Sequence, residues 1–220
     1  MNLIDSLIQE GYLKTPRIIE AFKKIKRVDF LPEDLKDLAE LNEALPISFG
    51  QTISQPLVVA FMLELLEPKE GEKILDIGSG SGWTSALLGE IVGSNGKVIA
   101  IEIVPELVEF GKKNVGKYNF VEKGIVEFIC ADGYKGYEKE APFDKILVSA
   151  TAIRIPDSWK KQLKVGGRIV TPINSSIWLF IKKSEKKGDE PSAHLNSVQE
   201  DFVFEQIEYP GFVFVPLIEK

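Results

Sequence analysis

The chain has 220 residues and a formal net charge of -6, and 44% of its residues are hydrophobic while 27% are charged. This composition argues against a general nucleic-acid binder, which needs clustered lysine and arginine, and no apolar stretch reaches the roughly 18 residues of a membrane span. The first ten residues contain Asp5, Gln9 and Glu10 and no leading basic cluster, so we expect no secretory signal and a cytoplasmic protein.

Cysteine and histidine are scarce, which limits the chemistry. The single cysteine, Cys130, lies in an apolar stretch, and we expect it to pack in the core of a protein from a reducing compartment. The single histidine, His194, lies in a polar segment that is typical of an exposed loop. Neither a histidine-based triad nor a histidine-rich metal cluster can be assembled, so we expect no metal site.

The first part of the chain, up to about residue 45, has apolar residues at helical spacing and predicts an N-terminal helical cap. Within it Thr15-Pro16 has the pattern of an N-cap followed by proline at the first helical position. The basic groups of the chain are expected on solvated faces or loop ends. They are Lys23, Lys24, Lys26 and Arg27 in the cap, and Lys182, Lys183, Lys186 and Lys187 later on.

Residues 45–56 read Leu-Pro-Ile-Ser-Phe-Gly-Gln-Thr-Ile-Ser-Gln-Pro. This segment is rich in hydroxyls and turn formers and has no helical period. Residues 57–66, which follow, are strongly apolar and predict a largely buried helix.

From residue 72 the predicted strands and helices alternate, which implies a parallel sheet covered on both faces through right-handed crossovers. The predicted strands span 73–77, 97–102, 126–131, 143–149 and 168–173, and the helices span 83–92, 105–118 and 155–163. Further on, apolar residues alternate without intervening helices, which predicts antiparallel strands at one edge over 177–182, 201–208 and 211–217. We expect one domain, residues 1–220, made of a cap with the hydroxyl-rich segment (1–56), a core (57–174) and edge strands (175–220).

The turn after the first strand of the core is the run Gly78-Ser79-Gly80-Ser81-Gly82. Glycines allow the backbone to turn sharply and a ligand to lie against it, and the helix that follows offers unpaired N–H groups. A dinucleotide site needs G-x-G-x-x-G, and Ser85 stands where that pattern wants glycine or alanine. The turn therefore predicts a nucleotide-like ligand other than NAD.

Acidic residues end the next two predicted strands. Glu102 comes about 20 residues after the glycines, where a carboxylate hydrogen-bonds ribose hydroxyls, and Asp132, followed by Gly133, can accept from an adenine amino group. Each feature alone has an ordinary explanation, namely a tight connection, a solvated strand end and a routine Asp-Gly turn. Because all three fall at the carboxyl ends of successive strands, together they predict a pocket for a nucleoside cofactor.

The motif Asp76-x-Gly-x-Gly-x-Gly, with the two strand-end carboxylates, resembles the class I S-adenosylmethionine-dependent methyltransferases. Nearly the whole chain resembles one family among them, the protein-L-isoaspartate O-methyltransferases, and residues 51–56, Gln-Thr-Ile-Ser-Gln-Pro, are the most specific match. Further similar segments are residues 27–33, 132–137, 141–144, 162–168 and 214–217. The resemblance implies a Rossmann-like, doubly wound α/β fold with a mostly parallel seven-stranded sheet, and S-adenosyl-L-methionine as the cofactor.

The same resemblance implies an enzyme that methylates the free carboxyl of isoaspartyl residues in damaged proteins or peptides and acts as a monomer. Ser54 takes the position of the family's active-site serine, and Thr52 and Ile53 border donor and acceptor. The donor would be held by Gly78, Ser79, Gly80, Ser81, Gly82, Glu102, Asp132 and Gly133. A carboxylate is ionised near neutral pH and attacks a methyl group without a general base, so Ser54 would only position it by a hydrogen bond.

Two readings of the serine stay open, because Thr52 and Ser54 can also cap the helix that starts near Pro56. The chain also departs from the family pattern. Arg154 has entered the loop over 149–156, where it either attracts an anionic acceptor or lies in solvent, Leu57 to Val59 stand where some members carry a histidine, and Ile218 replaces a frequent threonine. These changes leave two alternatives: a relative that acts on another peptide carboxylate, or a non-catalytic module that binds the donor.

Overall fold

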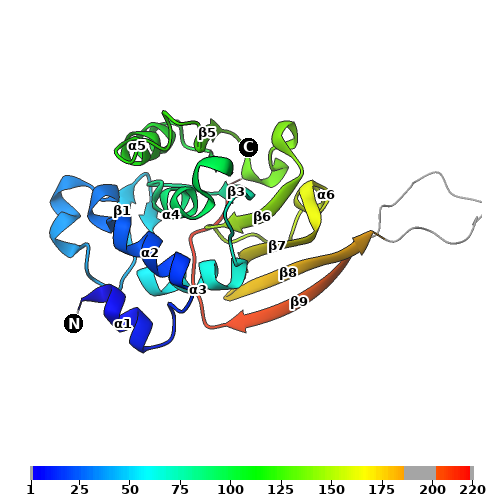
Figure 1. The fold of residues 1–220 in the computed structure, drawn as a ribbon, viewed down its shortest axis with the longest axis horizontal. Helices are drawn as coiled ribbons and strands as arrows, with labels where there is room; N and C mark the ends of the chain where they lie inside the picture. Colours follow the sequence, from blue (N-terminus) through cyan, green and yellow to red (C-terminus); the bar gives the residue numbers. More distant parts are fainter. Residues whose placement is uncertain (1, 186–201, 219–220) are drawn as a thin grey trace, which may run out of the picture.

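The computed structural model describes residues 2–185 and 202–218 (Figure 1). The predicted helical cap forms the first part of the molecule. It consists of α1 (Leu3–Gln9), α2 (Pro16–Lys24) and two short 3-10 helices, η1 (Arg27–Phe30) and η2 (Glu33–Leu38). Thr15 is the N-cap of α2 as predicted, but its hydroxyl donates to Glu64 at 2.7 Å and so ties the cap to the next helix.

The hydroxyl-rich segment folds as a short antiparallel hairpin of β1 (Leu45–Ser48) and β2 (Gln51–Ile53), which was not predicted. Its tip has left-handed backbone at Ser48, Phe49 and Gly50, where φ is 93°, 53° and 69°. Two of these residues are not glycine, so the turn has no simple sequence signature. The apolar helix that follows, α3 (Pro56–Leu66), is largely buried as predicted.

The sheet has seven strands in the order β5-β4-β3-β6-β7-β8-β9. Pairing is parallel from β5 to β7 and antiparallel from β7 to β9, which confirms the predicted mostly parallel sheet with antiparallel edge strands. The strands are β3 (Lys73–Ile77), β4 (Lys97–Glu102), β5 (Val126–Cys130), β6 (Phe143–Val148), β7 (Leu163–Ile173), β8 (Ser176–Glu185) and β9 (Phe202–Pro210).

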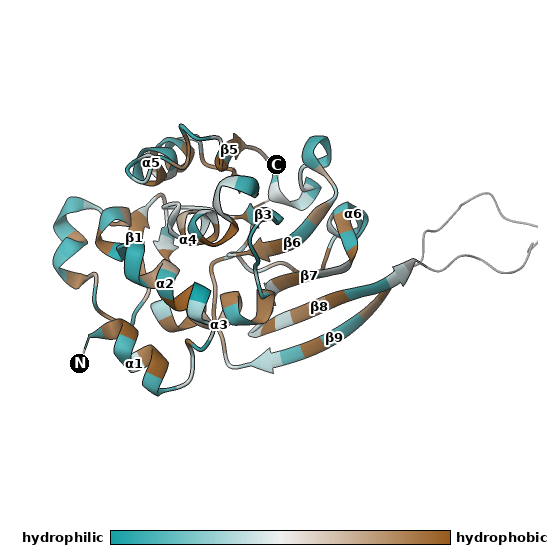
Figure 2. Cartoon of the chain, in the orientation of Figure 1, coloured by the Kyte–Doolittle hydropathy of each residue, from teal (hydrophilic) through white to brown (hydrophobic). Residues whose placement is uncertain are grey.

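Helices cover both faces of the sheet (Figure 1). Successive residues of β3 alternate between two hydrophobic clusters: Ile74 packs with α3, α4 (Trp83–Val92) and α5 (Pro105–Gly116), and Leu75 packs with α6 (Asp157–Gln162) on the other face. Outlying helices such as α2 and α5 show both hydrophilic and hydrophobic residues (Figure 2), because one side of each lies on the core. This two-sided packing fixes the carboxyl ends of the parallel strands at one edge of the sheet.

Residues 211–217 do not form the predicted antiparallel strand. Gly211 leaves β9 with φ of 98°, and the backbone N–H groups of Gly211 and Phe212 both bond to the carbonyl of Ser175. The segment then forms only an isolated parallel bridge between Thr151 and Pro216. The turn at Gly211 ends the β8–β9 ladder, and the segment crosses the carboxyl edge of the sheet instead of extending it.

Element boundaries differ at the last parallel strand. The predicted helix over 155–163 is shorter, because β7 already begins at Leu163, whereas the prediction began at Arg168. The pairing of β6 with β7 shifts register between Phe143 and Lys145, so the two glycines at 166 and 167 are accommodated within the strand. A Cβ on Gly167 would lie 2.7 Å from the carbonyl of Asp144, so this strand needs a bare residue there.

Three predictions about single side chains are wrong. Arg27 and Lys182 are buried, not solvated, and each donates to backbone carbonyls. Cys130 is exposed, because it is the last residue of the edge strand β5. The predictions for His194 and for residues 186 and 187 lie outside the described residues.

No helix in the part of the chain that the structure describes is long and apolar enough to cross a membrane.

Close packing of α4 against α5 depends on Gly82, the N-cap of α4. A Cβ added there would lie 2.8 Å from Cγ2 of Val115 and 3.0 Å from the carbonyl oxygen of Gly111, and φ is 85°. Both observations assign Gly82 to helix packing.

We therefore expect Gly82→Ala to lower the free energy of unfolding by about 2–4 kcal/mol, the sum of a left-handed alanine and an overpacked contact. Denaturant unfolding measures this. Gly116→Ala is the matched control, because Gly116 is a helical residue with open space around it, and alanine there should be neutral or stabilising by up to about 1 kcal/mol. Equal stability of both variants would contradict the packing role.

Candidate active site

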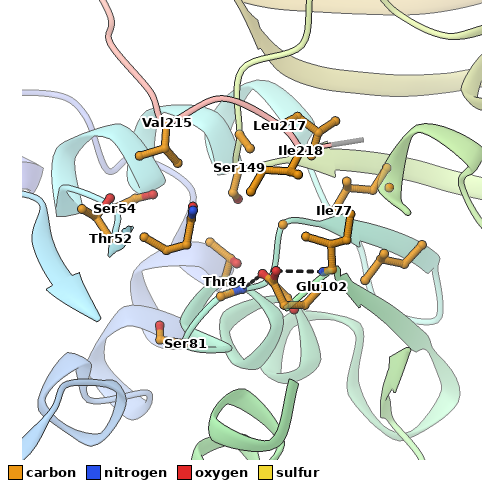
Figure 3. A pocket seen from close by; sticks show the side chains of 18 of the residues that line it. Thr52, Ser54, Ile77, Ser81, Thr84, Glu102, Ser149, Val215, Leu217 and Ile218 are labelled. Carbon is orange, nitrogen blue, oxygen red and sulfur yellow. Dashed lines mark hydrogen bonds between the residues drawn. The ribbon is translucent and has the colours of Figure 1, made fainter. Parts of the chain in front are cut away.

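A pocket lies at the carboxyl ends of β3, β4 and β6 (Figure 3). The pocket is open to solvent, and the empty space in it, with the open mouth included, is about 720 Å³. The pocket is lined by the hairpin exit (51–54), the end of β3 with the glycine turn and the start of α4, the end of β4 (101–103), the segment after β5 (131 and 133), the loop after β6 (149–150) and the terminal segment (215–218). Ligands of open α/β sheets bind at this edge.

The glycine turn supplies bare backbone to the pocket wall. Gly78 and Gly80 have φ of 76° and 49°, and the N–H groups of Gly78 and Ser79 both bond to the carbonyl of Ile101 at 2.9 and 3.0 Å. A Cβ on Gly80 would lie 3.3 Å from Cδ1 of Ile47. A Cβ on Gly78 would lie 3.6 Å from the Cβ of Ala150, which lines the pocket, so the glycine leaves this part of the wall without a side chain.

Glu102 is 6% exposed and lines the pocket (Figure 3). Oε2 accepts from the backbone N–H of Gly80 at 3.0 Å, and Oε1 accepts from those of Ile103 and Val104 at 2.8 and 3.0 Å. These bonds fix the carboxylate in place while leaving acceptor capacity for a ligand. Glu102 lines the predicted pocket, and its bonds to ribose hydroxyls stay a prediction.

The hairpin exit brings Thr52, Ile53 and Ser54 to the same pocket (Figure 3). In that view Thr52 and Ser54 lie to the left of the cavity, Leu217 and Ile218 to the upper right, and Glu102 below. Ser54 and the predicted donor residues that line the cavity therefore meet there, although the donor residues follow Ser54 by 24 (Gly78) to 79 (Gly133) positions in the sequence.

The capping alternative for Thr52 and Ser54 is wrong. The N-cap of α3 is Gln55, and the first-turn N–H of Leu57 is satisfied by the side-chain oxygen of Asn42 at 2.9 Å.

Two of the predicted donor residues do not line the cavity. Gly82 packs against α5, and Asp132 accepts from the backbone N–H of Tyr134 at 3.0 Å and pairs with Lys135 at 3.4 Å. Gly133 does line the cavity, and the indole N–H of Trp159 bonds to its carbonyl at 2.8 Å. Asp132 therefore shapes the turn that carries Gly133.

Sequence reasoning missed several lining residues. They are Gln51, Ile77, Trp83, Thr84, Ile101, Ile103, Ala131, Ser149, Ala150 and residues 215–218. Residues 214–217 resemble a family motif, but their apolar alternation predicts a strand. The backbone N–H of Thr151 bonds to the carbonyl of Val215, and that of Leu217 to the carbonyl of Thr151, so the segment is tied to the pocket by main-chain bonds that leave no sequence signal.

Arg154, the charged residue by which the loop over 149–156 departs from the family pattern, does not line the cavity. The residue is exposed. Ile153 beside it is 83% exposed. In residues 2–185 and 202–218, no group of three or more His, Cys, Asp or Glu side chains is placed to hold a metal ion.

Asp76, at the end of β3, lies behind the glycine turn and is fully buried. Its Oδ2 accepts from the hydroxyls of Ser85 at 2.6 Å and Thr84 at 3.0 Å, and its Oδ1 has no hydrogen-bond partner. Burial raises the pKa of Asp76 from 3.8 to about 6, against the two hydroxyl bonds, and the nearby Glu102 adds to the rise. The carboxyl thus joins β3 to the first turn of α4.

The glycine turn, the strand-end carboxylate and the hydroxyl-bearing hairpin agree with what known proteins show. A family model described as protein-L-isoaspartate(D-aspartate) O-methyltransferase matches residues 1–204. The chain belongs to this family. Members use S-adenosylmethionine as methyl donor, so the chain is an S-adenosylmethionine-dependent methyltransferase.

Relatives named protein-L-isoaspartate O-methyltransferase extend over nearly the full chain. The protein from Methanopyrus kandleri is 40% identical over 99% of this chain and 90% of its own length. The protein from Thermococcus onnurineus is 43% identical over 99% of this chain and 92% of its own length.

Solved structures share the fold. A protein-L-isoaspartate O-methyltransferase structure has a TM-score of 0.81 at 28% identity and covers 97% of this chain, which spans 64% of that longer protein. A Plasmodium falciparum protein assigned to the same enzyme class, solved with S-adenosyl-L-homocysteine, has a TM-score of 0.81 at 21% identity and covers 100% of both chains.

The residues present fit the family's nucleoside donor. Bare backbone at Gly78 and Gly80 leaves room against the sheet edge, and Glu102 offers a fixed acceptor at the strand end. These are the features by which open α/β folds hold a ribose.

Asp76 gives a prediction about pH. Its pKa is higher in the folded chain than in the unfolded one, so the folded state binds a proton more readily, and the stability it contributes is present below pH 3.8 and lost as the pH rises through about 6. Relative to Asp76→Asn, whose side chain does not titrate, wild type should lose up to about 3 kcal/mol of unfolding free energy over the whole window, about 2 kcal/mol of it above pH 4.5. Denaturant unfolding of both proteins between pH 4.5 and 7.5, without donor, measures this. Parallel pH profiles would contradict it.

Proposed function

We propose that the protein transfers the methyl group of S-adenosylmethionine to the free α-carboxyl of L-isoaspartyl residues, in the pocket at the carboxyl edge of the sheet. The observation that carries the proposal is the meeting of two predicted sets of residues in one cavity. Glu102 and the glycine turn bound it on one side and the Gln51–Ser54 segment on another. The family membership supports the same acceptor.

The chemistry needs few side chains. When bound, S-adenosylmethionine supplies an activated methyl group. An isoaspartyl carboxyl is already ionised near neutral pH, so the chain need not remove a proton. Its task is to place one carboxylate oxygen in line with the methyl carbon, and such placement alone lowers the barrier by several kcal/mol.

In this proposal the Ser54 hydroxyl donates a hydrogen bond to the acceptor carboxylate and so orients the acceptor. Glu102 accepts from the ribose, while Gly78 to Ser81 and Gly133 border the donor, and Thr52 and Ile53 border both molecules. Gly82 and Asp132 act indirectly, through helix packing and the turn that carries Gly133. A nucleophilic serine is not needed, because the acceptor itself attacks.

We further propose damaged proteins and peptides as the partners, a monomeric state and a cytoplasmic location. The single cysteine of the chain, which cannot form an internal disulfide, supports the last of these.

The proposal predicts which carboxyl is labelled. With tritiated S-adenosylmethionine, an isoaspartyl peptide should take up a base-labile methyl group, while the same peptide with a normal aspartyl residue should not. A third peptide, with the isoaspartyl α-carboxyl amidated, should also stay unlabelled and so identifies the reacting group. Equal labelling of the first two peptides, or labelling of neither, would defeat the proposal. Labelling of some other peptide carboxylate alone would favour the redirected relative.

If Glu102 binds the donor and Ser54 orients the acceptor, a substitution at each residue should change a different measured quantity. Glu102→Gln should weaken binding of S-adenosyl-L-homocysteine by about 10- to 100-fold in calorimetric titration, since a charged acceptor is lost. Ser54→Ala should leave that affinity within about threefold and lower kcat/KM for the isoaspartyl peptide by about 10- to 100-fold. Glu122→Gln, in an exposed turn, is the control. Full activity of Ser54→Ala would remove the serine from the mechanism.

A further inference from the structure

One cation of the helical cap is buried beside the pocket and has no part in the proposed chemistry. Arg27 is 6% exposed. Its Nη1 donates to the carbonyls of Ala39 and Leu41 at 3.1 and 3.0 Å, and its Nη2 donates to those of Glu43 and Ser54 at 2.6 and 3.3 Å. The ion pairs that arginines form among the described residues involve Arg17 and Arg168. The guanidinium therefore serves backbone carbonyls.

Ser54 occupies a gap between two regular elements. The β1–β2 ladder ends with the pairing of Ile53 and Leu45, and the first main-chain bond of α3 runs from Val59 to the carbonyl of Gln55. The carbonyl of Ser54 takes part in neither, and it accepts from Arg27. Neither the hairpin nor the helix holds this residue through its own ladder.

The same guanidinium reaches the wall of the cavity. Its Cζ lies 5.5 Å from the ring centroid of Trp83, a buried residue that lines the pocket at the start of α4. Arg27 thus contacts the hairpin exit, the loop over 39–43 and the helix that follows the glycine turn. It joins the part of the site assigned to the acceptor to the part assigned to the donor.

The charge and the shape of the Arg27 guanidinium both suit it to hold several backbone carbonyls. Burial lowers the pKa of Arg27 to about 10, so the side chain is protonated near neutral pH. Bonds from a cation are stronger than those between neutral groups. The planar fork spreads its donors over carbonyls from two separate segments, and lysine, with one ammonium, cannot match that geometry.

We propose that Arg27 is a positioning residue for the methyl acceptor: its guanidinium fixes the backbone of Ser54, and through it the place of the Ser54 hydroxyl in the pocket. This inference rests on the proposed function of Ser54. The role differs from general stability because Arg27 acts on one segment, at a point where the flanking ladders leave the chain unheld.

The test is Arg27→Lys, which keeps the charge and loses the fork. We expect kcat/KM for the isoaspartyl peptide to fall by about tenfold or more, through kcat and the acceptor KM, while the dissociation constant for S-adenosyl-L-homocysteine stays within about threefold of wild type. Hydrogen–deuterium exchange should become at least severalfold faster in peptides covering residues 51–55, with β3 to β6 unchanged. All measurements are made well below the unfolding midpoint of the variant.

Arg17→Lys is the matched control. Arg17 lies in the same helical cap and also bridges to the body, through the carbonyl of Ile91 and the carboxylate of Glu70, but it does not line the pocket. This variant should keep wild-type kcat/KM and wild-type exchange over residues 51–55.

Other outcomes decide against the inference. Wild-type kcat/KM in Arg27→Lys, unchanged exchange over 51–55, or a parallel loss of donor affinity with faster exchange throughout the sheet would each overturn it, the last by showing a purely structural role. If wild type itself does not methylate the isoaspartyl peptide, the proposed function fails. The exchange comparison then still decides whether Arg27 fixes the Ser54 segment.

Discussion

The site depends on the close approach of bare backbone at one edge of the sheet. Gly82 allows α4 to pack within contact distance of Gly111 and Val115, and this packing sets where the turn from Gly78 to Ser81 lies. Main-chain N–H groups of that turn donate to the carbonyl of Ile101 and to the carboxylate of Glu102, both on β4. The strand next to β3 therefore holds the turn in place. The pocket wall is therefore a product of helix packing and strand pairing together, and a larger side chain in the turn would disturb both.

Buried polar groups connect the parts that surround this wall. Asp76 receives two hydroxyls from the first turn of α4, Trp159 holds the carbonyl of Gly133, and Arg27 holds carbonyls of the cap and of the hairpin exit. Each of these side chains comes from a different element and ends next to a lining residue. Burying such groups is costly unless hydrogen bonds compensate. The compensating partners are hydroxyls of α4 for Asp76, and backbone carbonyls of segments at the site for Trp159 and Arg27.

Much of this arrangement follows from sequence, and the exceptions have physical causes. Periodicity gave the order of strands and helices, and the position of glycines and carboxylates at strand ends gave the location of the pocket, because parallel strands necessarily share one edge. The hairpin at 45–53 escaped prediction since non-glycine residues adopt left-handed backbone at its tip. The sequence predicts Arg27 and Lys182 in solvent because a backbone carbonyl that accepts a hydrogen bond from a buried cation leaves no trace in the sequence. Gly82 and Asp132 belong to the predicted motif but do not line the cavity, since a sequence pattern shows which residues are neighbours and not which atoms face the pocket.

The crossing of residues 211–218 over the sheet edge has a consequence for folding during synthesis. A growing polypeptide leaves the ribosome from its amino end, so the hairpin, the glycine turn and Glu102 emerge long before residues 215–218. Those late residues join the cavity through two main-chain bonds to Thr151. A nascent chain that has already folded its central strands therefore has an open crevice, and the cavity takes its final form only when the last strand has been added and the chain has turned back at Gly211.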